Sequence, residues 1–181
     1  MKSEIYFITG NENKFKEVQA MLPEVKQLKL DLEEIQEIDA HKIIKAKMNQ
    51  AFKHKKANFI IEDTSLYLNC LNGLPGPLIK WFLETIGING VYNLTQKLGE
   101  NKAQAKTIIG YAKSKKEILF FEGIIEGEIV KPSGPTNFGW NPIFKPKGYN
   151  KTFQEMTKEE KNKISMRKLA VEKLKIYLEK D

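Results

Sequence analysis

Apolar and polar residues follow two different periods along the first part of this chain. Short apolar or alternating runs at residues 5–9, 27–32 and 58–61 predict strands. Between them, residues 12–22 and 39–53 carry apolar side chains at the spacing of a helix face. An alternation of strands and helices is typical of the α/β class.

The rest of the chain changes this picture, because long strands follow the early alternation. Residues 103–111 and 117–130 predict two strands that we expect to be antiparallel, with their turn at 113–116. Further helices are expected at residues 78–86, 91–98 and 163–180. We therefore expect an α/β fold with a mixed sheet, built as a single domain over residues 1–181.

Composition excludes several classes of protein. With one cysteine, Cys70, and two histidines among 181 residues, neither a disulfide scaffold nor a Cys/His zinc site is expected. No apolar run approaches the ~20 residues of a membrane span, and the first residues lack the features of a signal peptide. We expect a cytoplasmic protein without a membrane partner.

The net charge of +7 comes from 29 lysines and one arginine, Arg167, set against 23 acidic residues. The lysines are scattered, so two interpretations stay open: a solvated surface, or attraction to polyanions. Both favour a ligand that carries phosphate. The lone arginine is more informative, because lysine cannot copy its planar fork of donors.

The segment from Thr9 through Gly10 and Asn11 to Lys14 follows the first expected strand and opens the first expected helix. Unpaired backbone N–H groups and the positive end of a helix favour an oxyanion at such a turn. Lys14 adds a full charge, although the pattern is not a Walker A loop. The alternative is an ordinary turn capped by Thr9 or Asn11.

Two carboxylates, Glu62 and Asp63, close the apolar strand predicted at residues 58–61. Strand ends of α/β sheets are frequent ligand sites, and carboxylates together with phosphate oxygens suit Mg²⁺. Further oxygen ligands are available in an acidic segment, Asp31, Glu33, Glu34 and Glu37. The alternative for that segment is a solvated run of charge.

Two late segments offer recognition chemistry. Phe138, Gly139, Trp140 and Asn141 place aromatic rings and an amide in a loop, where they suit a nucleotide base or, alternatively, plug the core. Lys161 and Arg167 lie at the expected start of the last helix, where they suit phosphate and carbonyl oxygens. The alternative there is a solvated helix start capped near Asn162.

Taken together, these blocks resemble the inosine triphosphate pyrophosphatase family from end to end. The matching segments are Thr9-Gly10-Asn11-x-x-Lys14, Glu62-Asp63-Thr64, Leu74-Pro75-Gly76-Pro77, Phe138-Gly139-Trp140 and Glu160-Lys161-Asn162 through Ser165-x-Arg167. The resemblance implies a Mg²⁺-dependent hydrolase that splits deaminated purine nucleoside triphosphates (ITP, dITP, XTP) between the α- and β-phosphates. It also implies an elongated mixed sheet, two lobes flanking an active-site cleft, and a homodimer.

The resemblance also assigns residues. The triphosphate would contact Thr9, Gly10, Asn11, Lys14, Lys45 and Lys161. The metal would be held by Glu34 and Asp63, and catalysis would rest on Asp63, Glu62 and Lys14. The purine would be stacked and read by Phe138, Gly139, Trp140, Asn141, Met166 and Arg167.

Two positions depart from the family pattern. Asn141 stands where aspartate is typical, and Met166 stands where histidine is typical. An amide can donate where a carboxylate only accepts, and methionine offers a soft apolar surface in place of an imidazole. We therefore expect weaker discrimination against ATP and GTP. The alternatives are a catalytically weakened or altered-specificity nucleotide-binding protein of the same fold and, less favoured because the charge is scattered, a nucleic-acid-binding module.

Overall fold

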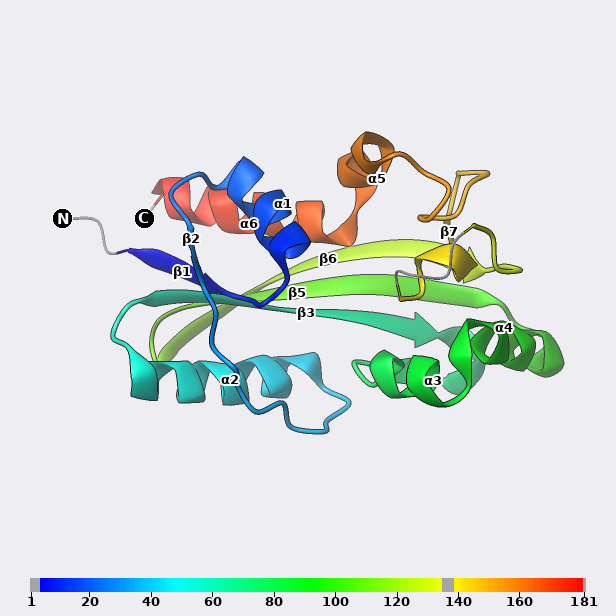
Figure 1. The fold of residues 1–181 in the computed structure, drawn as a ribbon, viewed down its shortest axis with the longest axis horizontal. Coiled ribbons are helices and arrows are strands. Elements are labelled where there is room, and N and C mark those ends of the chain that lie inside the picture. The colour runs from blue at the N-terminus through cyan, green and yellow to red at the C-terminus, as the bar shows by residue number, and fades with distance from the viewer. Residues whose placement is uncertain (1–3, 135–138, 181) are drawn as a thin grey trace. The chain divides into compact units, whose positions relative to one another are not determined.

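A mixed sheet is the framework of the fold in the computed structural model, which describes residues 4–134 and 139–180 (Figure 1). Its strands follow the order β2-β1-β3-β5-β6-β7, and β4 pairs with β3 off this path. β1 is parallel to β2 and β3, whereas β3–β4 and β6–β7 are antiparallel. The strands are β1 (Ile5–Ile8), β2 (Lys26–Leu28), β3 (Asn58–Leu68), β4 (Pro75–Gly76), β5 (Lys102–Ser114), β6 (Glu117–Ile129) and β7 (Phe144–Pro146).

Helices form close to where the apolar spacing predicts them, which confirms the α/β class with a mixed sheet. They are α1 (Glu12–Met21), α2 (Ala40–His54), α3 (Ile79–Thr85), α4 (Gly87–Leu98), α5 (Lys158–Ile164) and α6 (Met166–Lys180), with 3₁₀ turns at Asn69–Leu71 and Asn141–Ile143. No helix in the described part of the chain is long and apolar enough to cross a membrane.

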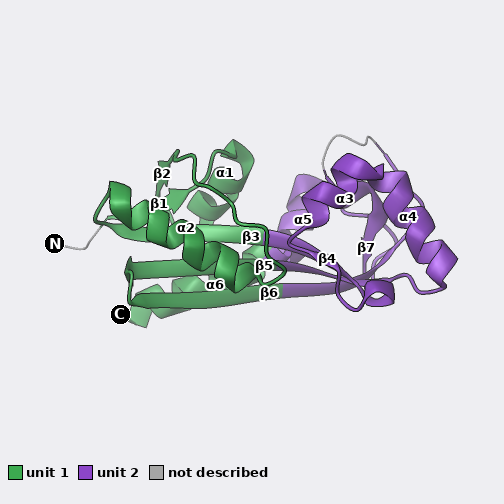
Figure 2. Ribbon diagram, turned by 90° about the horizontal axis from the view of Figure 1, so that it is seen from below, with its two compact units in different colours: residues 1–63, 107–123, 167–181 green, residues 64–106, 124–166 purple. Residues whose placement is uncertain are grey.

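The chain divides into two compact units, shown in different colours in Figure 2. Unit 1 comprises residues 1–63, 107–123 and 167–181, and unit 2 comprises residues 64–106 and 124–166. Strands β3, β5 and β6 contribute residues to both units. The single domain, the elongated shape and the cleft between two lobes stay predictions.

Unit 1 has two apolar layers because successive residues of a strand face opposite sides of the sheet. Tyr6, Ile8, Phe59 and Ile61 pack with α2, whereas Phe7 and Ile60 pack with α1 and α6. Figure 1 shows α2 on one side of β1 and β3, and α1 and α6 on the other. The close approach of α2 to the sheet depends on Gly110, where an added Cβ would lie 2.4 Å from Cγ2 of Ile44.

Unit 2 has its own core around the last part of β3 and the segment that leads to α5. Its aromatic centre consists of Trp140, Phe144 and Phe153, whose ring centroids are 5.2 to 6.3 Å apart. Met166 is also part of this core, with 4% of its surface exposed.

Two expectations about strand boundaries are wrong. The strand expected to close at Glu62 and Asp63 continues to Leu68, because apolar and β-forming residues such as Leu66 extend its pattern. The strand expected at residues 27–32 is short, since β2 ends at Leu28.

The prediction of a single last helix over residues 163–180 is also wrong. These residues form the end of α5 and the whole of α6. Ser165 has an extended backbone, with φ −67° and ψ 147°, and it separates α5 from α6. α5 starts earlier than expected, since Thr157 and Glu160 form a capping box there, rather than a cap near Asn162. Lys161 and Arg167 therefore lie on different helices.

Candidate active site

The turn between β1 and α1 is built by its own polar side chains. Asn11 caps α1, and its Oδ1 accepts hydrogen bonds from the backbone N–H groups of Asn13 and Lys14 at 3.0 and 3.1 Å. Thr9 Oγ1 accepts one from the Asn11 N–H at 3.1 Å. The ordinary capped turn, which the sequence left open as the alternative for this segment, is therefore present. Its hydrogen bonds define the first turn of α1, from which the Lys14 side chain projects.

Glu62 is the centre of a buried ionic cluster in unit 1. Its side chain is 1% exposed, and its Oε1 lies 2.8 Å from the Lys14 ammonium. The Arg167 guanidinium donates to the same carboxylate twice, from Nε to Oε2 at 2.7 Å and from Nη2 to Oε1 at 2.9 Å. The start of α1, the middle of β3 and the start of α6 thus meet at one carboxylate.

The charges of this cluster determine its protonation. Burial raises the pKa of Glu62 by penalising the charged form, but the opposite charges of Arg167 and Lys14 outweigh burial and hold this pKa far below its usual value of 4.5. Burial lowers the pKa of the largely buried Arg167, but the carboxylates of Glu62 and Glu17 outweigh burial and raise this pKa above its usual value. Glu62 therefore stays ionised near neutral pH and is a weak general base, so the geometry suits it to positioning Lys14 and Arg167.

Glu17 completes the cluster, and the sequence reasoning missed it. Its Oε2 accepts a hydrogen bond from Arg167 Nη1 at 2.5 Å. Two cations and two carboxylates are thereby combined in one network. The available signal was the position of Glu17 on α1, one helical turn after Lys14 and therefore on the same face.

Asp63 is half-buried and lies next to Glu62 in the middle of β3. Because side chains alternate along a strand, Glu62 belongs with Ile60 on the face that carries α1 and α6. Asp63 belongs with Phe59 and Ile61 on the face that carries α2. The structure thus directs the two predicted carboxylates to opposite faces of the sheet.

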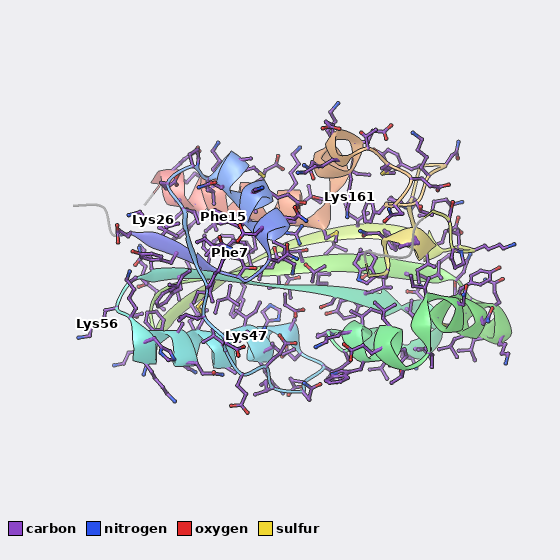
Figure 3. All side chains as sticks on the ribbon, viewed as in Figure 1. Phe7, Phe15, Lys26, Lys47, Lys56 and Lys161 are labelled. Atoms are coloured by element: carbon purple, nitrogen blue, oxygen red, sulfur yellow. The ribbon has the colours of Figure 1, made fainter. Side chains whose placement is uncertain are left out.

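Two lysines of α2 have different surroundings. Lys47, which Figure 3 labels on α2, is 17% exposed. It forms an ion pair with Glu34, the predicted metal ligand. Lys45, the predicted phosphate ligand, places its ammonium 5.6 Å from the ring centroid of Phe120. Residues two positions apart point to different sides of a helix, so Lys47, which the sequence reasoning missed, is the one that accompanies Glu34.

The acidic segment before α2 is mostly engaged with that helix. Glu37 pairs with Lys42 at 3.1 Å, and the backbone of Glu33 exchanges hydrogen bonds with the amide of Gln50 at 2.9 Å. Within residues 4–134 and 139–180, no group of three His, Cys, Asp or Glu side chains is arranged to hold a metal ion. Mg²⁺ is commonly held by one or two carboxylates plus waters and substrate phosphates, and the partly exposed Glu34 and Asp63 are donors of that kind.

The predicted residues of the late segments belong to unit 2, except Arg167. Trp140 is buried against Phe144, and Met166 is buried in the same core. Gly139 has a φ of +53°, and Asn141 begins the 3₁₀ turn and is half-buried. Phe138 lies outside the described residues.

Lys161, labelled in Figure 3, is on α5. Its ammonium lies 5.3 Å from the ring centroid of Phe153. The structure brings together the unit 1 residues Lys14, Glu62 and Arg167. A common site for these residues and those of unit 2 stays a prediction.

The fold and this ionic cluster define an α/β protein with a lysine presented at a strand-to-helix turn, a class suited to phosphate-bearing ligands. Residues 5–177 match the Ham1 family, and the chain belongs to that family.

Relatives and solved structures agree with this assignment. The chain is 41% identical to an inosine triphosphate pyrophosphatase of Schizosaccharomyces pombe, over 98% of this chain and 96% of that protein. It is 44% identical to one of Pyricularia oryzae, over 97% and 94%. The fold matches a Ham1 protein from Coxiella burnetii with a TM-score of 0.87, 25% identity and coverage of 99% and 100%.

Proposed function

We propose that this protein hydrolyses deaminated purine nucleoside triphosphates (ITP, dITP and XTP) to the monophosphate and pyrophosphate, with Mg²⁺. One observation carries the proposal. The ammonium of Lys14, in the first turn of α1, is held 2.8 Å from the buried carboxylate of Glu62 in β3. The family and its curated relatives, which are named inosine triphosphate pyrophosphatases, support the choice of substrate.

The residues of unit 1 provide the phosphate chemistry. Lys14 and the turn from Thr9 to Asn11 hold the triphosphate, while Glu62 and Arg167 keep Lys14 in place through the fixed ionic cluster. Lys47 adds a second ammonium on the side of the sheet that carries α2. Lysines around a phosphoanhydride stabilise the charge that develops on its oxygens during attack.

Asp63 orients the attacking water toward the α-phosphorus, and the pyrophosphate leaves in line. Glu34 and Asp63 would hold Mg²⁺, which, when bound, supplies charge neutralisation of the phosphates. Because water is the nucleophile, no covalent protein intermediate is needed.

The base is read by the late segments. Phe138 stacks on the purine, Trp140 and Met166 form the apolar wall, and the Asn141 amide hydrogen-bonds to the base edge. Arg167 has five N–H groups and donates three of them to Glu62 and Glu17, which leaves two for a carbonyl oxygen of the purine. Lys161 supplies a further phosphate contact.

An assay of product identity tests the function. Purified protein is incubated with Mg²⁺ and ITP, dITP, XTP, ATP, GTP or dUTP, and pyrophosphate, orthophosphate and nucleotides are quantified. We expect IMP and pyrophosphate in equal amounts from ITP. IDP and orthophosphate would contradict cleavage between the α- and β-phosphates.

A nucleotide-binding protein with weakened catalysis or altered specificity is the second candidate, and the departures at Asn141 and Met166 favour it. The same assay separates the two. Binding of ITP without release of pyrophosphate would support the second candidate, as would turnover of ATP and GTP at the rate of ITP.

We also propose a cytoplasmic homodimer. Leu74, Trp81 and Ile86 of unit 2 expose 44%, 46% and 46% of their surfaces, and exposed large apolar residues are common in protein interfaces. Sedimentation velocity should give twice the chain mass. Substitution Trp81→Glu should shift the protein toward the monomer if this surface is the interface.

A further inference from the structure

A lysine-lined cavity of about 670 Å³ lies in unit 1, away from the residues discussed so far. It is formed where α2 leads into β3 and where β5 turns into β6. The residues used here are Lys55, Lys56, Asn58, Lys113, Ser114 and Lys115. Figure 3 labels Lys56 at this place, beyond the last turn of α2.

The cavity carries an excess of positive charge. Glu4 also lines it, but this carboxylate forms an ion pair with Lys26 and accepts a hydrogen bond from the Tyr6 hydroxyl at 2.5 Å. Four lysines thus line the cavity, together with a carboxylate that is already engaged. The ammonium of one of them, Lys113, lies over Tyr177, which packs on the face of the sheet opposite Tyr6 and Lys55. Like charges held together repel one another, and an anion bound among them relieves that repulsion.

Two of the lysines are held in position by aromatic rings. The Lys55 ammonium lies 3.7 Å from the ring centroid of Tyr6, and the Lys113 ammonium lies 5.7 Å from that of Tyr177. Cation–π contacts of this kind favour these positions of the two ammonium groups by a modest amount. Phe52, another lining residue, packs edge-on against Phe59 with ring centroids 5.0 Å apart. Among the described residues that line the cavity, Phe52 is the one aromatic side chain against four lysines, so the lining is suited to phosphate oxygens rather than to a stacked base.

The cavity lies at the opposite ends of the strands from the Lys14–Glu62 cluster. β1 and β3 are parallel, and the cavity contains Glu4, just before β1, and Asn58, the first residue of β3. The turn of Thr9 to Lys14 instead follows the last residue of β1. One ligand at the turn after β1 cannot also occupy this cavity, since the length of β1 separates them.

We propose that this cavity is a second anion site that binds an oligophosphate, an anion of two or more linked phosphates. Several ammonium groups around one cavity match the closely spaced charges of linked phosphates better than those of a single carboxylate. Asn58 and Ser114 add neutral hydrogen-bonding groups to the lining. The proposal concerns residues that take no part in the proposed hydrolysis.

Binding of inorganic pyrophosphate and tripolyphosphate tests this site. Backbone and lysine side-chain NMR signals of the full chain are followed during titration, so that residues 55–58 and 113–115 are observed separately from the turn at residues 9–14. We expect saturable shifts at residues 55–58 and 113–115 that weaken as salt is added.

The variant Lys56→Gln/Lys115→Gln removes two exposed charges from the cavity. The affinity measured at residues 55–58 and 113–115 should fall by about tenfold or more, because two charge-assisted contacts are lost. The matched control, Lys97→Gln/Lys175→Gln, removes two exposed lysines outside the cavity and should leave that affinity unchanged. Thermal unfolding and ITP turnover of both variants should equal those of the parent.

Three results would overturn the proposal. The first is an equal loss of affinity in the control variant, and the second is sulfate binding as tight as tripolyphosphate. The third is a single-stranded oligonucleotide that shifts the same signals at lower concentration than tripolyphosphate, which would assign the surface to nucleic acid. Failure of ITP hydrolysis would not affect this proposal, because the titration is read at other residues.

Discussion

The carboxylate of Glu62 accepts two hydrogen bonds from the guanidinium of Arg167, at 2.7 and 2.9 Å, across 105 positions of the sequence. This fork-to-fork contact connects the middle of β3 with the start of α6. Because Lys14 pairs with the same carboxylate, the position of the proposed phosphate-binding lysine depends on the arginine.

Replacement Arg167→Lys keeps the charge but removes the planar fork. We expect the KM for ITP to rise by about tenfold or more and the free energy of unfolding to fall by about 1–3 kcal/mol, since hydrogen bonds to buried charge are lost. Steady-state kinetics and urea unfolding measure the two effects. The exposed control, Lys175→Arg, should change neither quantity. Equal KM values for Arg167→Lys and the control would remove Arg167 from the site.

Replacement Glu62→Gln tests the ionic cluster through pH. At pH 7 the variant should lose about 3–5 kcal/mol of stability, because Arg167 and Lys14 lose a buried partner. The cluster lowers the pKa of Glu62 in the folded state, so its stabilisation is complete above pH 4.5 and declines as pH falls below 4.5. Between pH 4.5 and pH 3 the parent should lose about 2 kcal/mol that the variant does not. Urea unfolding of both proteins at pH 7, 4.5 and 3 measures this, and a constant difference across the three values would contradict the assignment.

Glu17 should matter less than Glu62, because its side chain is 21% exposed and its contact with Arg167 is a single hydrogen bond. We expect Glu17→Gln to destabilise the protein by less than half as much as Glu62→Gln. Both effects act through Arg167, so a double-mutant cycle of Glu17→Gln with Arg167→Lys should give a coupling energy of about 0.5–3 kcal/mol. Additive effects would show that Glu17 does not act on the cluster.

Local sequence patterns predicted most elements, since each depends on neighbouring residues. The apolar run in β1 and the apolar spacing in α1 and α2 are properties of short windows. The boundary of β3 was misjudged because the charged pair Glu62–Asp63 looks like the end of a strand. In the folded protein, Arg167 and Lys14 neutralise Glu62, so the strand can continue through it.

The site was harder to predict where it depends on long-range contacts. The spacing of Glu17 from Lys14 places the two on one face of α1, but the partners that give Glu17 and Lys47 their roles, Arg167 and Glu34, lie 150 and 13 positions away in the sequence. In the sequence, Lys45 and Lys47 are two similar charges on one helix. Only the folded position of α2 beside the acidic segment shows that Lys47, and not Lys45, pairs with Glu34. The motif at Thr9 to Lys14 was readable because its capping bonds are local.

Asp63→Asn tests the orientation of water. The change keeps the size of a half-buried side chain and removes its charge, so the fold should be retained. We expect kcat to fall by about 10²–10⁴-fold, the usual contribution of a positioned acid–base group. Pyrophosphate release and thermal unfolding are measured together, with Asp31→Asn as the matched control outside β3. An unchanged kcat would exclude Asp63 from the chemistry.

The departures from the family pattern at Asn141 and Met166 predict weak discrimination between ITP and ATP. Asn141 can donate or accept, so it fits a 6-amino purine as well as a 6-keto purine. Met166 is 4% exposed within the core of unit 2, so Met166→His alone should destabilise the protein by burying an imidazole. The double variant Asn141→Asp/Met166→His supplies a carboxylate as the partner of the new imidazole. Its ratio of kcat/KM for ITP to kcat/KM for ATP should exceed that of the parent by about tenfold. Pyrophosphate release with each nucleotide measures this ratio, and unfolding curves identify loss of fold. Equal rejection of ATP by the parent and the folded double variant would show that these two positions do not set the base preference.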